Sequence, residues 1–206
     1  MSLALRKFLT YVIGILILTL GIALTIQSKM GTSPFDALLV GLFRSFGLTI
    51  GSWEIIVGLT MVLLNAIAQK KRPEYLALLT SLITGAGIDF WVFLLHDWLN
   101  PATLIGQLVC VNIGILLSGL GIAVYLQADY APNPIDRMML VIRNITGLNV
   151  SLSRTLINVI LVLLAVGFSG PIGIGTLLNA IFSGIIINFF MGLIKHGYLF
   201  STTEAH

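Results

Sequence analysis

Charged residues are scarce in this sequence. Asp, Glu, Lys and Arg together make up 9% of the 206 residues, whereas hydrophobic residues make up 57%. A soluble domain carries about 25% charged residues, so this chain has too few to cover a water-facing surface. Its net charge of +3 is too small to indicate a nucleic-acid partner. The composition therefore predicts an integral membrane protein that is surrounded by the lipid bilayer.

Residues that carry chemistry are also few. Cys110 is the only cysteine, which excludes an internal disulfide. The three histidines have no metal-ligand spacing. The chain contains no G-x-S-x-G, H-E-x-x-H or P-loop motif. We therefore expect neither an enzyme nor a protein that holds a metal ion or a cofactor.

What the chain does contain is an internal repeat. Residues 20–36 read LGIALTIQSKMGTSPFD, and residues 120–136 read LGIAVYLQADYAPNPID. Polar and proline positions match at a constant offset of 100, in the pairs Gln27/Gln127, Pro34/Pro134 and Asp36/Asp136. With a shift of one residue, the same pattern pairs Asp89 with Asn188. Internal duplication is typical of transporter folds, so we expect one membrane domain with repeats over residues 8–98 and 103–196.

Six apolar segments are long enough to span a bilayer, which takes about 17–25 residues. They are Phe8–Ile26, Ser52–Ala68, Glu74–Leu95, Thr103–Leu126, Leu152–Phe168 and Ile172–Ile194. Each repeat contains three of them. The expected fold is therefore an all-α polytopic membrane protein with six transmembrane helices.

Two shorter segments, Pro34–Phe46 and Pro134–Thr146, each follow the first spanning helix of a repeat. A capping residue before the proline (Ser33 or Asn133), an aspartate in the first turn and a final glycine predict a short helix in each. Thirteen residues reach only about 20 Å, short of the roughly 30 Å hydrocarbon core. The two helices are either re-entrant or lie flat in the interface.

The basic residues indicate how the chain crosses the membrane. If the short helices do not cross, nine of the eleven Lys and Arg residues lie on one side, including Lys70–Arg72. The positive-inside rule identifies this side as the cytoplasm, and both termini then lie there. Three crossings per repeat is an odd number. We therefore expect the second repeat to be inverted relative to the first.

The candidate ligand-binding residues surround the two breaks that precede the short helices. They are Gln27, Ser33, Pro34, Asp36, Gln127, Asn133, Pro134 and Asp136. In inverted-repeat transporters, half-helices point their N-termini at a site near the midplane. Free backbone N–H groups and the helix dipole attract anions or polar ligand groups there.

Asp89 is the candidate coupling residue. It lies well inside the third predicted spanning helix, where a carboxyl group costs about 2.5–3.5 kcal/mol at mid-bilayer. One interpretation is a proton- or cation-coupling carboxylate. The alternative is a position near the outer interface, where Asp89 holds helices together. Glu54, at the start of the second spanning helix, is expected to be interfacial rather than buried.

The pattern G-I-A-x-x-x-Q, followed by G-T-S-P-F-D-A-L and a later G-x-G-I-D, resembles the YczE/YyaS/YitT group of bacterial integral membrane proteins. The resemblance covers most of the chain and is most specific at residues 31–36. It implies a bacterial cytoplasmic membrane but no reaction. A transport role, including export, has been proposed for relatives. The group is often described with five crossings, whereas the count here is six.

These observations predict a multi-pass secondary transporter of the bacterial inner membrane, with its site between the repeats. The substrate is a small molecule that the sequence does not identify, and export is one option. The alternative is a non-transporting accessory protein that supports a partner enzyme or permease. In that case the paired aspartates matter for folding only, and no aqueous path reaches Asp89. Pairing as a homodimer stays open.

Overall fold

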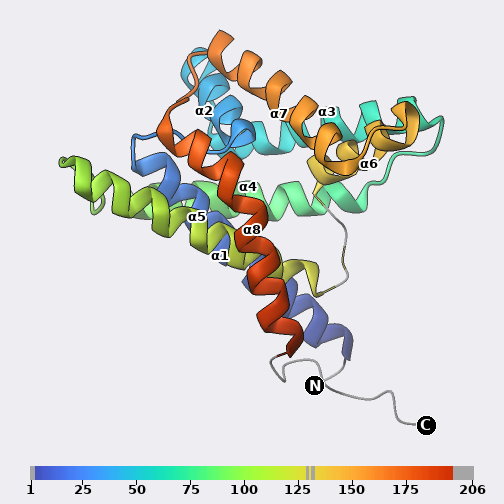
Figure 1. Ribbon diagram of the computed structural model, residues 1–206, viewed down its shortest axis with the longest axis horizontal. Coiled ribbons are helices and arrows are strands. Elements are labelled where there is room, and N and C mark those ends of the chain that lie inside the picture. The colour runs from blue at the N-terminus through green and yellow to red at the C-terminus, as the bar shows by residue number, and fades with distance from the viewer. Residues whose placement is uncertain (1–2, 129, 131–132, 197–206) are drawn as a thin grey trace.

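The computed structural model describes residues 3–128, 130 and 133–196, and this part of the chain is all-helical (Figure 1). The helices are α1 (Leu3–Gln27), α2 (Pro34–Phe46), α3 (Ile50–Gln69), α4 (Leu76–Leu95), α5 (Leu104–Leu126), α6 (Pro134–Thr146), α7 (Val150–Gly167) and α8 (Ile174–His196). The all-α prediction is confirmed.

Within the described residues, five helices are long and apolar enough to cross a membrane: α1, α3, α4, α5 and α8. The apolar stretch of α7, Leu152–Gly167, is shorter. A multi-pass membrane protein is therefore supported with five spanning helices. The sixth crossing, by α7, stays a prediction.

The short helices α2 and α6 begin and end where the sequence predicts. The Ser33 side chain accepts a hydrogen bond from the backbone N–H of Asp36, and the Asn133 side chain accepts one from that of Ile135. A glycine follows each helix, with φ of 77° after α2 and 72° after α6. Residues with a Cβ rarely adopt such angles, so glycine ends both helices.

Helices α1 and α5 run in opposite directions and cross in close contact (Figure 1). A Cβ atom at Gly21 would collide with the Gly114 carbonyl oxygen, and one at Gly114 would collide with the Gly21 oxygen. Likewise, a Cβ atom at Gly121 would meet the Gly14 oxygen. Because Gly14/Gly114 and Gly21/Gly121 are equivalent in the repeat, the contact is reciprocal. Small residues of this kind let transmembrane helices approach closely.

Most other helix contacts also come in equivalent pairs. Helix α4 packs on α1 as α8 packs on α5, and α2 packs on α7 as α6 packs on α3. The exception is the pair α3 and α4, which pack together closely. Within the described residues, their equivalents α7 and α8 do not pack along each other, and Figure 1 shows them diverging from their connecting loop.

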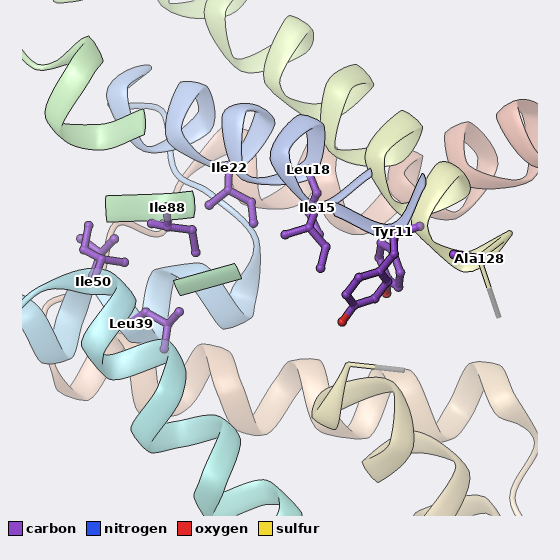
Figure 2. Packing of buried hydrophobic residues seen from close by; sticks show 10 residues of the cluster. Tyr11, Ile15, Leu18, Ile22, Leu39, Ile50, Ile88 and Ala128 are labelled. Atoms are coloured by element: carbon purple, nitrogen blue, oxygen red, sulfur yellow. The ribbon is translucent and has the colours of Figure 1, made fainter. Parts of the chain in front are cut away.

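The main apolar core lies where α1 meets α2, α3, α4 and α5 (Figure 2). Tyr11 and Ile15 of α1 are fully buried, as are Leu39 of α2 and Ile88 of α4. Many large apolar side chains elsewhere point outward, including Phe189 of α8. Outward apolar side chains suit a surface that contacts lipid, so apolar character alone does not mark the core side of each helix.

Candidate functional site

A cavity of about 150 Å³ lies between the two halves of the chain. Its lining draws on equivalent positions of both repeats. The matched pairs are Leu18/Ser118, Ile22/Ile122, Ser33/Asn133, Phe35/Ile135, Glu54/Arg154 and Thr84/Ser183. A site between the repeats is the position that the sequence predicts.

The structure brings together only part of the predicted binding residues. Ser33, Pro34, Asp36 and Asn133 line the cavity. Pro134 instead lines a second cavity of about 60 Å³. Gln27 and Gln127 are half-buried and are not among the lining residues of either cavity. The side chain of Asp136 lies outside the described residues.

Asp36 is held at the start of α2. The Ser33 hydroxyl donates to Asp36 Oδ2 at 2.5 Å and accepts from the Asp36 backbone N–H at 3.2 Å. Helix α2 is not one of the five spanning helices. Burial raises the pKa of the Asp36 carboxyl to about 6, although hydrogen bonds from Ser33 and Thr32 act to lower it. The start of α2 thus brings Asp36, one of the predicted binding residues, into the lining of the cavity.

Glu54 corrects a prediction. Expected at the interface, it is 1% exposed. Among the described residues, its Oε1 atom has no hydrogen-bond partner. The reason is tertiary: α2 folds back against α3, so residues in the first turns of α3 face the protein interior. The repeat offset is the signal that could have found this residue, because it pairs Glu54 with the only charged residue of α7, Arg154.

The rest of the polar lining differs between the two halves. The Thr84 hydroxyl of α4 is 2% exposed and also has no partner among the described residues. The second half contributes Arg154 and Asn158 from α7, and Asn179 from α8. Arg154 is exposed, whereas Glu54 is buried. The acidic residues of the lining, Glu54 and Asp36, are therefore buried, and its basic residue, Arg154, is exposed.

Asp89 lies elsewhere. Its Oδ2 atom accepts a hydrogen bond from the Thr49 hydroxyl at 2.6 Å, and its Oδ1 atom accepts one from the Gly51 backbone N–H at 2.8 Å. Asp89 thus caps the start of α3 from α4, and it is not among the residues that line the cavity. This geometry favours the alternative that Asp89 holds helices together. The coupling role stays a prediction.

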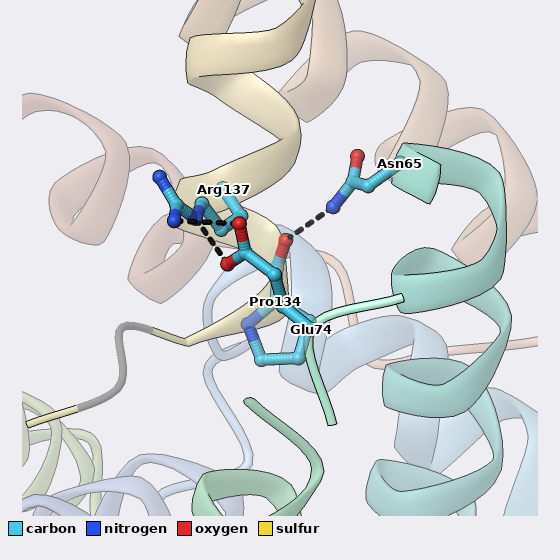
Figure 3. Close-up of polar contacts among 4 residues, drawn as sticks. All are labelled: Asn65, Glu74, Pro134 and Arg137. Carbon is cyan, nitrogen blue, oxygen red and sulfur yellow. Dashed lines mark hydrogen bonds and ion pairs between the residues drawn. The ribbon is translucent and has the colours of Figure 1, made fainter. Parts of the chain in front are cut away.

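A second polar cluster anchors α6 (Figure 3). The Arg137 guanidinium donates to both carboxylate oxygens of Glu74, at 2.6 and 2.7 Å. The Asn65 side chain donates to the Pro134 carbonyl oxygen at 3.3 Å. These contacts fix the first turn of α6 to the end of α3 and the segment before α4.

Helix α2 is anchored in an equivalent way by the loop between α7 and α8. The Arg44 guanidinium donates to the Ser169 carbonyl oxygen at 2.9 Å. Before the helix, the backbone N–H of Gly175 donates to the Met30 carbonyl oxygen at 2.8 Å. Each short helix and the residues before it thus contact the other half in or near the equivalent loop. Ser33 and Asn133, which precede the two helices, both line the cavity.

Comparison with known proteins gives a family and no activity. A family model described as a family of unknown function (DUF6198) matches residues 5–192. The uncharacterized protein YyaS of Bacillus subtilis is 47% identical over 193 residues, which cover 94% of this chain and 96% of that protein. The uncharacterized membrane protein YczE of the same organism is 38% identical over 182 residues, with 87% and 82% covered. An uncharacterized protein of Haemophilus influenzae is 28% identical over 178 residues, with 86% and 80% covered. No solved structure matches.

Proposed function

The chain belongs to the YyaS/YczE-like family of membrane proteins (DUF6198), and we propose that it is a secondary transporter of a small molecule in the bacterial cytoplasmic membrane. One observation carries the proposal. The cavity is built from equivalent residues of both sequence halves and contains a buried carboxyl group without a partner among the described residues. Intramembrane ionisable groups are costly and mark ligand or ion pathways.

The reciprocal contact of α1 with α5 supports an inverted repeat. Gly21 meets Gly114, and Gly14 meets Gly121, so exchanging the two halves leaves the pairing unchanged. A two-fold axis that relates two antiparallel helices is perpendicular to both. For helices that cross the bilayer, this axis lies in the membrane plane, which is the arrangement of inverted-repeat transporters.

The positions of the helix ends and of the loops between them fit six crossings, with both termini in the cytoplasm. In Figure 1, the loop between α3 and α4 lies at the right, and the start of α1 and the end of α8 lie at the bottom, right of the centre. The loop between α4 and α5 and the loop between α7 and α8 lie toward the left. The right side carries the Lys70–Arg72 cluster, so the positive-inside rule assigns it to the cytoplasm. Helix α7 has 18 residues, about 27 Å, close to the hydrocarbon thickness.

The packing difference between the halves fits alternating access. Helices α3 and α4 close on each other near Gly51 and Gly85, at the end assigned to the outside. On the opposite side, α7 and α8 diverge, and a Cβ atom at Gly184 would meet no described atom within 4 Å. Both α7 and α8 line the cavity. We infer that the cavity opens between them toward the cytoplasm in this conformation.

Water accessibility of the cavity tests the proposal. Single cysteines replace Ser33, Asn133 or Ser183 in a Cys110→Ala background, and an impermeable thiol reagent is added to either side of sealed vesicles. Cysteine in place of Ile160, an exposed apolar residue of α7, serves as the lipid-facing control. A transporter predicts labelling of the three cavity positions from both sides and none of the control. Labelling from one side only would favour the accessory protein.

A further inference from the structure

The strongest unexplained feature is the group of buried oxygen-bearing side chains in the cavity lining. Glu54 is 1% exposed and its Oε1 atom has no partner among the described residues. The buried Thr84 hydroxyl, unpartnered in the same way, lines the same cavity, as does Asp36. Burying polar groups without partners is costly, and native proteins rarely do so without a reason. Three oxygen-bearing side chains thus surround space that a positively charged group would fill.

The size and lining of the cavity limit what can fill it. A cavity of about 150 Å³ is the size that holds benzene in an engineered protein interior. Apolar side chains such as Ile22, Phe35, Ile115 and Ile157 line much of it. A hydrated inorganic ion makes no use of these walls, whereas a compact organic body does.

The charged residues of the lining indicate how a ligand would be oriented in the cavity. Arg154 and Tyr125 also line the cavity. Among the charged groups, the two carboxyl groups, of Glu54 and Asp36, are buried and Arg154 is exposed. A ligand with one positive end can place that end against Glu54 and its apolar body against the surrounding walls. An anion placed beside Glu54 would bring its charge next to two carboxyl groups.

We propose that this cavity binds a small organic cation, an amine of about the size of benzylamine, with the Glu54 carboxylate as its counter-ion and the Thr84 hydroxyl as a further acceptor. The inference rests on the proposed function and gives its substrate class. Glu54, rather than Asp89, is then the residue that meets the transported charge.

The test measures binding of three probes of similar size to the full chain in nanodiscs by calorimetry. Benzylamine carries a positive charge, benzyl alcohol is neutral and benzoate is negative. Because a hydrogen bond between charged groups is stronger than one between neutral groups, we expect benzylamine to bind at least about tenfold more tightly than benzyl alcohol. Benzoate is expected to bind most weakly. This comparison needs no variant, so misfolding cannot obscure it.

Variants then assign the charge preference to one residue. Glu54→Gln keeps the shape of the side chain and should remove the preference for benzylamine over benzyl alcohol. The matched control is Asp97→Asn, which removes an exposed carboxylate outside the cavity and should leave both affinities unchanged within about twofold. Equal binding of the three probes to the unmodified protein would overturn the proposal, and so would a retained amine preference in Glu54→Gln.

The proposed cation site and the proposed transport function can fail independently of each other. If benzylamine does not bind but the cavity cysteines are labelled from both sides, the substrate class is wrong and the transporter stands. If the amine binds through Glu54 but labelling occurs from one side only, the cation site stands and transport fails.

Discussion

The helix pairs α3–α4 and α7–α8 occupy equivalent positions in the two repeats but pack differently. We call the line along which the two helices of each pair face each other the α3–α4 seam and the α7–α8 seam. In the first, Gly51 and Gly85 bring the two backbones together, and Asp89 reaches across to cap α3. In the second, Gly184, the equivalent of Gly85, has no described atom near its added Cβ. Asn188, the equivalent of Asp89, is exposed. Related sequences are therefore compatible with a closed seam and with an open one.

The difference identifies where the molecule can change. The α1–α5 crossing is reciprocal and tightly packed, so it provides a fixed centre. The α3–α4 seam is closely packed, whereas α7 and α8 do not pack along each other within the described residues. An inverted-repeat transporter changes its open side when the two halves exchange conformations.

The largest loss of stability is expected at the α1–α5 crossing. Alanine at Gly21 or at Gly114 places a Cβ atom against the backbone of the opposite helix, and such overpacking costs up to about 3 kcal/mol. Because the contact is reciprocal, both variants should lower the midpoint of thermal unfolding in detergent substantially. If one variant is strongly destabilised and the other is neutral, the symmetric centre is refuted.

The next largest loss of stability distinguishes the closed α3–α4 seam from the open α7–α8 seam. In Gly85→Ala the new Cβ atom would lie 2.5 Å from the Gly51 carbonyl oxygen, so we expect a loss of about 2 kcal/mol. Gly184→Ala is the matched control. It should be neutral, or stabilising by less than about 1 kcal/mol through its better helix propensity. Thermal unfolding of both proteins measures the difference, and equal losses would mean that the seams do not differ.

A smaller effect is expected at the cap. Asp89→Ala removes two acceptors from the start of α3, which costs about 1–2 kcal/mol for a capping residue. Asn188→Ala should change stability by less than about 0.5 kcal/mol because Asn188 is exposed. Hydrogen exchange at residues 50–53 provides a local readout, since loss of the cap should accelerate exchange there. Unchanged exchange would contradict the capping role.

The smallest effect is expected at the α6 anchor. Glu74→Gln breaks the ion pair with Arg137, whose side chain is 38% exposed, against 49% for Glu74. Ion pairs this exposed contribute about 0–1 kcal/mol, and salt should reduce the difference. Chemical unfolding at low and high ionic strength tests this. A loss well above about 1 kcal/mol would mean that the pair is shielded from solvent.

Local signals made much of the fold predictable. The caps at Ser33 and Asn133 and the glycines after α2 and α6 predict the bounds of both short helices correctly. These features depend on neighbouring residues in the chain, which the sequence displays directly. The sixth predicted spanning helix stays a prediction, because the apolar stretch of α7 is shorter than those of the five spanning helices.

The candidate site was predicted only in part, for physical reasons. Position next to a break does not decide which face of a helix a residue occupies, so Gln27 and Gln127 do not reach the cavity. Glu54 was missed because its burial depends on α2 folding back on α3, a tertiary contact. The difference between the seams has a signal in the sequence, because Gly51 corresponds to Ser151 and Asp89 corresponds to Asn188. What this signal does to the packing depends on contacts between helices, which local patterns do not show.

The most direct test of the account is the distance across each seam, measured with paired spin labels. One pair replaces Ile56 and Leu82 on α3 and α4. The other replaces their equivalents Leu156 and Ile181 on α7 and α8, and all four residues are exposed. In the Cys110→Ala background in nanodiscs, double electron–electron resonance should give a short and a long distance for each pair. Benzylamine should shift the two populations in opposite directions. A single fixed distance for each pair, with and without the amine, would contradict exchange between the halves.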